Sequence, residues 1–112
     1  MFYRERSIYM NFNLNYEGFE DYLLKRTDLS DFRNGVQYLF KFPNNRGASV
    51  IKHTSSYGYS EDLWELGVIR FGTDDDVWGL DYETEITNDV IGFLTDEDVR
   101  ELLKRIKELD TV

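Results

Sequence analysis

Hydrophobic and polar residues alternate along two neighbouring stretches in the middle of the chain, residues 36–42 and 48–53. A period of two places successive side chains on opposite faces, so each stretch is predicted to be a half-buried strand. The run between them, Pro43–Gly47, is rich in turn-forming residues. The two strands are therefore predicted to form a β-hairpin with a longer loop.

A second pair of strands is predicted further along. Residues 63–71 form a strand with Trp64 on its apolar face. The acidic run at 73–76 turns the chain, and residues 77–82 are predicted to return as the next strand. Residues 83–88 carry no clear period and are expected to be irregular.

Two patterns occur nearer the N-terminus. Apolar residues alternate with tyrosine and asparagine over 8–16, which predicts another strand. Residues 17–26 place Phe19 and Tyr22 at helical spacing, with acids early and bases late, which predicts a short helix. A further helical turn is predicted near 28–32.

The C-terminal region has the clearest pattern of the chain. Thr95 is a good helix N-cap, and three acids follow it in the first turn. An apolar stripe then recurs at helical spacing: Val99, Leu102, Leu103, Ile106 and Leu109. A helix with one apolar face must pack on something, and a sheet is the simplest choice.

Together these elements predict an α+β domain. We expect an antiparallel sheet of about four to five strands, with the C-terminal amphipathic helix packed on one face. Residues 1–112 are expected to form a single domain. If Met10 is the native start, residues 1–9 are a flexible N-terminal extension.

The composition excludes several classes of function. The net charge is −9, and a strongly acidic chain lacks the basic footprint that nucleic acids and anionic membranes require. The chain has no cysteine, so it has no thiol nucleophile and no cysteine-ligated metal. No apolar run reaches membrane-spanning length, and the N-terminus lacks the apolar stretch of a signal peptide. A cytoplasmic location is therefore expected.

The charge is uneven along the chain. Residues 1–60 hold six acids and eight bases, whereas residues 61–112 hold 16 acids and five bases. No Lys or Arg occurs between Arg70 and Arg100. The candidate protein-binding carboxylates in this window are Asp74, Asp75, Asp76, Asp81, Glu83, Glu85 and Asp89. They predict either a surface that attracts a basic partner or a solvated face that keeps the domain soluble.

Aromatic residues make up 16% of the chain. Tyr57 and Tyr59, in a polar loop, are candidate contact residues because aromatics are enriched at interface hot spots. Anchoring of that loop is the alternative role. Trp64 and Trp78 are further candidates, with core packing as the alternative role, and for Trp64, on the apolar strand face, core packing is favoured.

Catalytic patterns are weak. His53 is the only histidine, and no nucleophile-elbow pattern surrounds any serine. The run Asp74–Asp76 does not match the alternating calcium-loop pattern, and no glycine-rich phosphate-binding motif occurs. We therefore expect no catalytic residue, no metal and no cofactor, and a protein that is not an enzyme.

Several segments of residues 36–109, taken together, carry a resemblance to known proteins. They are Phe42-Pro43-Asn44, Gly47-Ala48-Ser49-Val50, Ser56-Tyr57-Gly58, Leu63-Trp64-Glu65-Leu66, Ile86-Thr87-Asn88-Asp89-Val90-Ile91-Gly92 and Leu94-Thr95. With them the chain resembles small uncharacterised proteins of phages and prophages of Gram-positive bacteria. The resemblance implies a bacterial cytoplasm as the setting and brings no catalytic residues with it.

The expected function is that of a small acidic phage-type accessory protein. It would bind and inhibit a basic host or defence protein, including nucleic-acid-binding ones, by imitating the charge of nucleic acid. No direct contact with nucleic acid or membrane is expected. The alternative is a structural or assembly protein that acts as a homo-oligomer or adaptor.

Overall fold

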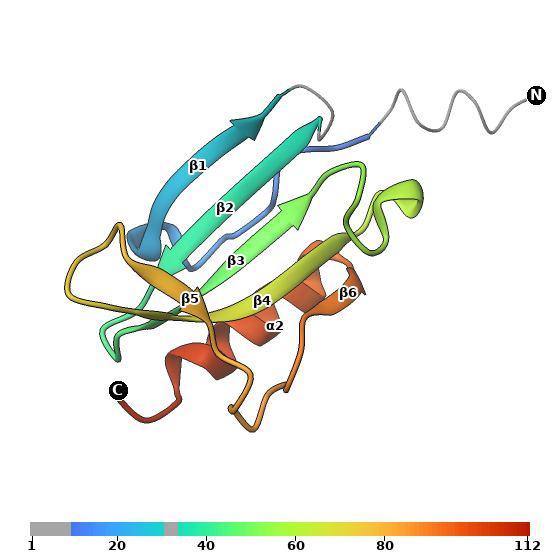
Figure 1. Ribbon diagram of the computed structural model, residues 1–112. Coiled ribbons are helices and arrows are strands. Elements are labelled where there is room, and N and C mark those ends of the chain that lie inside the picture. The colour runs from blue at the N-terminus through green and yellow to red at the C-terminus, as the bar shows by residue number, and fades with distance from the viewer. Residues whose placement is uncertain (1–9, 31–33) are drawn as a thin grey trace, which may run out of the picture.

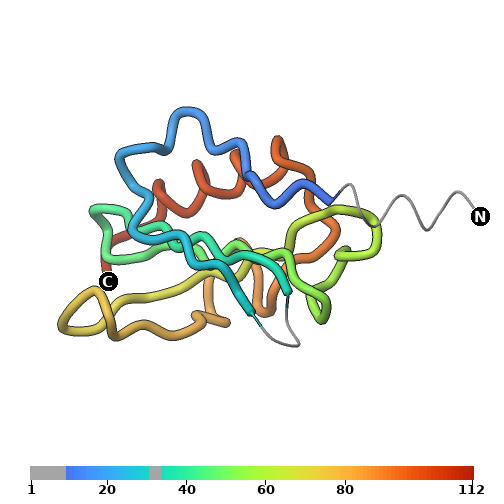
Figure 2. The backbone as a smooth tube through the Cα atoms, turned by 90° about the horizontal axis from the view of Figure 1, so that it is seen from above, coloured from blue at the N-terminus to red at the C-terminus, as the bar shows by residue number. Residues whose placement is uncertain are grey.

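A computed structural model describes residues 10–30 and 34–112 of the protein. Within these residues the chain forms a six-stranded antiparallel sheet, with helix α2 on one face (Figures 1 and 2). The strands follow in the order β1-β2-β3-β4-β5, and β6 also pairs with β4. Their bounds are β1 Leu23–Leu29, β2 Gly35–Lys41, β3 Arg46–Lys52, β4 Trp64–Phe71, β5 Trp78–Leu80, β6 Ile91–Leu94 and α2 Asp96–Lys107. The predicted α+β class is confirmed.

The main core lies between the sheet and α2. Alternate side chains of the three central strands point into it and are almost fully buried. They are Val36, Tyr38 and Phe40 of β2, Ala48 and Val50 of β3, and Trp64, Leu66 and Val68 of β4. From the helix, Val99, Leu103 and Ile106 meet them. The period-two strands and the helical stripe were therefore correctly predicted, since both patterns record the face that each element buries.

Helix α2 begins where the sequence indicated. Thr95 accepts a hydrogen bond from the backbone N–H of Asp98, and the Asp98 side chain accepts one from the backbone N–H of Thr95. This reciprocal capping satisfies two backbone donors that the first turn leaves free. The acids of the first turn and the bases of the last turn both favour the helix dipole.

The prediction of a strand over 8–16 is wrong for the part that the structure describes. Residues 10–16 are extended but pair with no strand, and they cross the helix-bearing side of the sheet (Figure 2). Leu14 is buried and the flanking asparagines Asn13 and Asn15 are exposed. An extended chain lying on a core buries alternate side chains whether or not a ladder forms, which explains the pattern. Residues 8 and 9, like the predicted extension 1–9, lie outside the described residues.

The Tyr38 hydroxyl ties this segment down. It donates to the carbonyl oxygen of Phe12 (3.0 Å) and accepts from the backbone N–H of Leu14 (3.2 Å). Arg26 Nε also donates to it (3.0 Å), and this hydrogen bond raises the pKa of Arg26 above its ordinary value. The guanidinium therefore stays charged beside the tyrosine.

The predicted helix over 17–26 is also wrong. Only the 3₁₀ turn η1 (Glu20–Tyr22) forms, and the chain then continues as edge strand β1. Phe19 and Tyr22 do reach the core, where both rings pack on Phe42. From Leu23 onward, pairing with β2 overrides the local helical preference. The turn predicted near 28–32 begins inside β1, and residues 31–33 lie outside the described residues.

Beyond β4 the chain uses one strand edge twice. The short strand β5 pairs with the end of β4, opposite Ile69–Phe71, and β6 pairs with its beginning. The predicted return strand 77–82 is therefore confirmed only for Trp78–Leu80, and residues 83–88 are irregular as expected. Strand β6 was not predicted, because four residues before a helix give too short a period to recognise.

The buried side chain of Asn44 joins the β2–β3 turn to the end of α2. Its Nδ2 donates to the carbonyl oxygens of Ile106 (2.8 Å), Lys107 (3.3 Å) and Leu109 (3.0 Å). Its Oδ1 accepts from the backbone N–H of Arg46 (3.1 Å). Ile106 and Lys107 belong to the last turn of α2, where carbonyl oxygens lack their usual partner four residues later in the helix, and Leu109 follows the helix end.

Replacing Asn44 by alanine is expected to lower the free energy of unfolding by about 1–3 kcal/mol, the cost of leaving buried polar groups unpaired. Urea unfolding followed by circular dichroism measures this change. Asn13→Ala serves as the control, because Asn13 is exposed, and its effect should stay within about 0.5 kcal/mol. Equal stabilities for the two variants would contradict the role given to Asn44.

Candidate functional site

The candidate carboxylates lie on the hairpin between β4 and β5 and on the loop that follows. We call residues 72–90 the acidic segment. Figure 2 shows the β4–β5 hairpin bending away from the side of the sheet that carries α2. The structure gives the seven carboxylates of this segment different surroundings, and these decide which of them can meet a partner.

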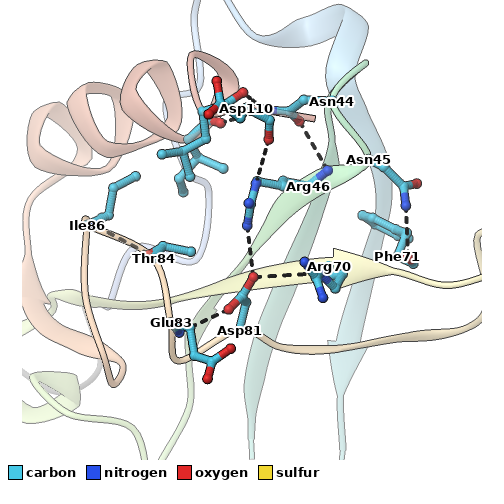
Figure 3. Close-up of polar contacts among 12 residues, drawn as sticks. Asn44, Asn45, Arg46, Arg70, Phe71, Asp81, Glu83, Thr84, Ile86 and Asp110 are labelled. Atoms are coloured by element: carbon cyan, nitrogen blue, oxygen red, sulfur yellow. Dashed lines mark hydrogen bonds and ion pairs between the residues drawn. The ribbon is translucent and has the colours of Figure 1, made fainter. Parts of the chain in front are cut away.

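Asp81 is held inside the molecule. Its side chain is 10% exposed and forms an ion pair with Arg46, whose side chain is 13% exposed, at 2.8 Å. Arg70 approaches the same oxygen at 3.8 Å, and the second oxygen accepts from the backbone N–H of Glu83 (3.0 Å). Figure 3 shows Arg46 lying between Asp81 and the backbone of Asp110, where it donates to the carbonyl oxygen at 2.9 Å. The charge of Asp81 is thus already compensated within the fold.

The three consecutive aspartates occupy the exposed tip of the β4–β5 hairpin. Asp74 accepts from the backbone N–H of Asp76 (2.9 Å), a local bond that shapes the turn. Asp75 forms an ion pair with Lys41 of β2. Lys41 also lies over the ring of Phe71, 5.1 Å from its centre. The charge of Asp75 is therefore partly compensated by Lys41, whereas Asp74 and Asp76 form no ion pair among the described residues.

Glu83, Glu85 and Asp89 are exposed. Glu83 borders a hollow of about 380 Å³ beside Arg70, and Glu85 borders one of about 180 Å³ beside Arg105 of α2. The Asp89 carboxylate accepts from the backbone N–H of Val90. Glu83, Glu85 and Asp89 therefore keep their negative charges exposed to solvent.

The two tyrosines predicted as contact residues differ in their exposure to solvent. Tyr57 is 61% exposed, whereas Tyr59 is half-buried and its ring stacks on Phe12 at 6.5 Å between centres. The sequence reasoning missed Phe93 of β6, which is 56% exposed. Its backbone N–H donates to the carbonyl oxygen of Tyr57 at 3.4 Å. No sequence signal marked Phe93, because its exposure depends on a positive backbone φ that is unusual for phenylalanine.

The face of the sheet opposite α2, here called the open face, has a small apolar cluster of its own. Leu39, Ile69 and Phe71 are buried there, with Trp78 against them. A hollow of about 200 Å³ lies on this face, lined mainly by apolar residues and bordered by His53 and Glu65. That volume is below the usual size of a small-molecule site and fits about one side chain.

Two polar groups that could carry chemistry have structural contacts instead. His53 Nδ1 accepts from the backbone N–H of Ser55 (3.1 Å), which closes a turn. Lys52, which sequence reasoning did not single out, is 2% exposed and forms an ion pair with Asp62 (2.7 Å). It also donates to the carbonyl oxygen of Asn11 (2.6 Å) and lies over the ring of Trp64 at 4.2 Å. Its place on the inner face follows from the alternation of β3.

No family model matches the chain, and no curated protein or solved structure matches it. The resemblance of residues 36–109 to phage proteins stays a prediction. Across residues 10–30 and 34–112, no group of three or more His, Cys, Asp or Glu side chains is arranged to hold a metal ion. In the same part of the chain, no helix combines the length and apolar character needed to cross a membrane.

Proposed function

We propose that this chain is a small acidic accessory protein, of the kind that phages encode, which binds a basic host or defence protein in the bacterial cytoplasm and inhibits it. One observation carries the proposal. Five exposed carboxylates of the acidic segment have no ion-pair partner among the described residues: Asp74, Asp76, Glu83, Glu85 and Asp89. Lys41, Arg46 and Arg70 pair with Asp75 or Asp81 instead. Arg105, which lines the same hollow as Glu85, forms no ion pair among the described residues.

The distribution of these charges favours a basic partner with a groove or concave surface. Asp74 and Asp76 lie at the tip of the β4–β5 hairpin, and Glu83, Glu85 and Asp89 lie on the loop after β5, so the unpaired charges extend along both segments. A surface of one sign speeds association with a partner of opposite sign, and salt weakens the effect. A nucleic-acid-binding enzyme has such a basic groove, and occupying it would block its substrate.

Reversing three charges tests the proposal. The carboxylates of Asp76, Glu83 and Glu85 accept no hydrogen bond and form no ion pair among the described residues. Changing each residue to lysine should therefore leave the fold intact. The partner is first captured on the tagged protein from bacterial lysate at low salt and then purified. Association with the triple variant is expected to be about 10- to 1,000-fold slower, as measured by stopped-flow fluorescence.

The matched control reverses three exposed acids elsewhere, Glu17, Asp21 and Glu101. The change in net charge is the same, so only the position of the charges differs. Association of this control should slow much less than that of the first variant. Equal rates for the two variants would show that the acidic segment is not the contact.

A structural or assembly role is the second candidate function. Strand β1 has seven residues and, among the described residues, pairs with a strand on one side only, so its other edge can pair with another chain. Sedimentation at low and high salt separates the two functions. An oligomer that persists at high salt would favour assembly, because apolar and backbone contacts are not screened.

A further inference from the structure

Two exposed aromatic residues lie on backbone segments that contact each other at one end of the molecule. Tyr57 belongs to the loop between β3 and β4, and Phe93 belongs to β6; Figure 1 shows both segments at the same end. The Tyr57 carbonyl oxygen accepts from the backbone N–H of Phe93. They are the most exposed of the large hydrophobic residues that the structure describes, at 61% and 56%. We call them the aromatic pair.

The backbone beneath the aromatic pair is tightly fixed. A β-carbon on Gly92 would lie 2.4 Å from the Tyr57 β-carbon, and one on Gly58 would lie 3.0 Å from the backbone of Phe93. The lack of a side chain at Gly92 therefore leaves room for Tyr57, and the lack of one at Gly58 leaves room for the backbone of Phe93. Phe93 itself has φ +59°, a conformation that costs free energy in a bulky residue. A strained, exposed phenylalanine gives nothing to the core, so its presence points to a binding role.

Some aromatic rings of this protein have a cation over their face, whereas the rings of the aromatic pair, like most of the other described rings, do not. Four rings have a cation over their face: Tyr38 with Arg26, Phe71 with Lys41, Trp64 with Lys52, and Tyr22 with Lys107. Among the described residues, no cation lies over Tyr57 or Phe93. A negative charge is close by, since Glu65 accepts from the backbone N–H of Tyr57 at 2.9 Å.

We propose that the aromatic pair is a docking point for an arginine side chain of the basic partner. The inference rests on the proposed function, because it takes the partner to be basic, and it adds a contact outside the acidic segment. The face of an aromatic ring attracts a cation, and the carboxylate of Glu65 adds to the attraction. Arginine fits better than lysine, because its planar, weakly hydrated guanidinium stacks on rings.

The probe is a blocked peptide, Gly-Arg-Gly-Arg-Gly, with a second peptide in which neutral citrulline replaces both arginines. Each is titrated into the full chain while the ring proton resonances of Tyr57 and Phe93 are followed by NMR. The arginine peptide should shift both rings, and the citrulline peptide should not. Rings that do not move, or that move equally with citrulline, overturn the inference.

Variants locate the contact. Tyr57→Ser with Phe93→Asn should weaken peptide binding about 5- to 30-fold, the summed loss of two cation–π contacts. Tyr82→Ser is the matched control, because Tyr82 is 51% exposed and lies within the acidic segment. Its effect should be less than twofold. An equal loss from Tyr82→Ser would place the arginine elsewhere and overturn the inference.

Stability separates binding from a structural role. Asparagine tolerates a positive φ, so Phe93→Asn alone should keep the thermal midpoint or raise it by up to about 5 °C while peptide binding falls. A lowered midpoint would instead show that Phe93 supports the fold, and would overturn the inference.

The two proposals fail separately. Ring shifts that are absent, together with slow partner association in the Asp76, Glu83 and Glu85 variant, overturn the docking point and leave the proposed function standing. Ring shifts that are present, together with unchanged partner association in that variant, overturn the acidic segment as the contact and leave the docking point standing.

Discussion

Replacing Trp64 by alanine is expected to lower the free energy of unfolding by about 3–5 kcal/mol, the range for deleting a buried large aromatic side chain. Trp64 is 1% exposed and lies between the sheet and α2. Its ring meets Tyr38 edge-on at 5.7 Å, and the ammonium of Lys52 lies over it at 4.2 Å. Its indole N–H donates to Asp96 at 2.7 Å, at the start of α2. The substitution therefore removes packing, a cation contact and a tie to the helix together.

Trp78→Ala is the matched control, since the chain has two tryptophans on opposite faces of the sheet. Trp78 is only half-buried, so its loss should cost about half as much or less. Guanidinium unfolding measures both variants, and a shift in midpoint without a change in slope reports stability alone. A domain of this size has about 5–15 kcal/mol in total, so Trp64→Ala should approach the unfolding threshold. Equal costs for the two variants would contradict the placement of the main core.

Asp81→Asn is expected to cost about 3 kcal/mol, although it changes only the charge of one group in the acidic segment. The ion pair with Arg46 is almost buried, and removing one partner leaves a cation without compensation, which typically costs about 3–5 kcal/mol. The lower end applies here because the Arg46 guanidinium keeps its bond to the Asp110 carbonyl oxygen. The free energy of unfolding, measured in urea, tests this value.

Asp76→Asn is the control for Asp81→Asn, because Asp76 lies in the same segment but is exposed. Its cost should stay within about 0.5 kcal/mol. A third variant, Asp81→Leu with Arg46→Met, removes both charges and should recover part of the lost stability. If Asp81→Asn proved as mild as Asp76→Asn, the pair would be a surface contact and Asp81 would return to the set of candidate binding residues.

Strands β2, β3 and β4 and helix α2 were predictable because each has a strong period that matches its own geometry. Thr95 and the acids after it marked the start of α2, and Pro43–Gly47 marked the turn between β2 and β3. These signals depend on residues close together in the chain, and the side chains they assign to the inner face are the ones that the core buries. The same reasoning failed at 17–26, where two aromatic residues at helical spacing reach the core from a single turn and the chain then pairs with β2.

The candidate site, like the fold, has residues that the sequence located and others that only the structure placed. The sequence located the acidic window and Tyr57, because charge and residue type are properties of the chain itself. It ranked Asp81 with its neighbours, and only the approach of Arg46, 35 positions away, removes Asp81 from the surface charge. It missed Phe93, whose exposure follows from a backbone angle and from contact with the loop at Tyr57.

The sequence by itself thus determined the α+β class, the three central strands, the capped helix and the uneven charge. Period, capping and charge depend on residues close together in the chain, so they can be read without the fold. The tertiary structure decided that residues 10–16 lie unpaired over the core, that β5 and β6 share the edge of β4, which carboxylates stay unpaired, and which aromatics face solvent. Each of these depends on contacts between distant residues, which compete with local preference and, where they bury or pair more groups, prevail.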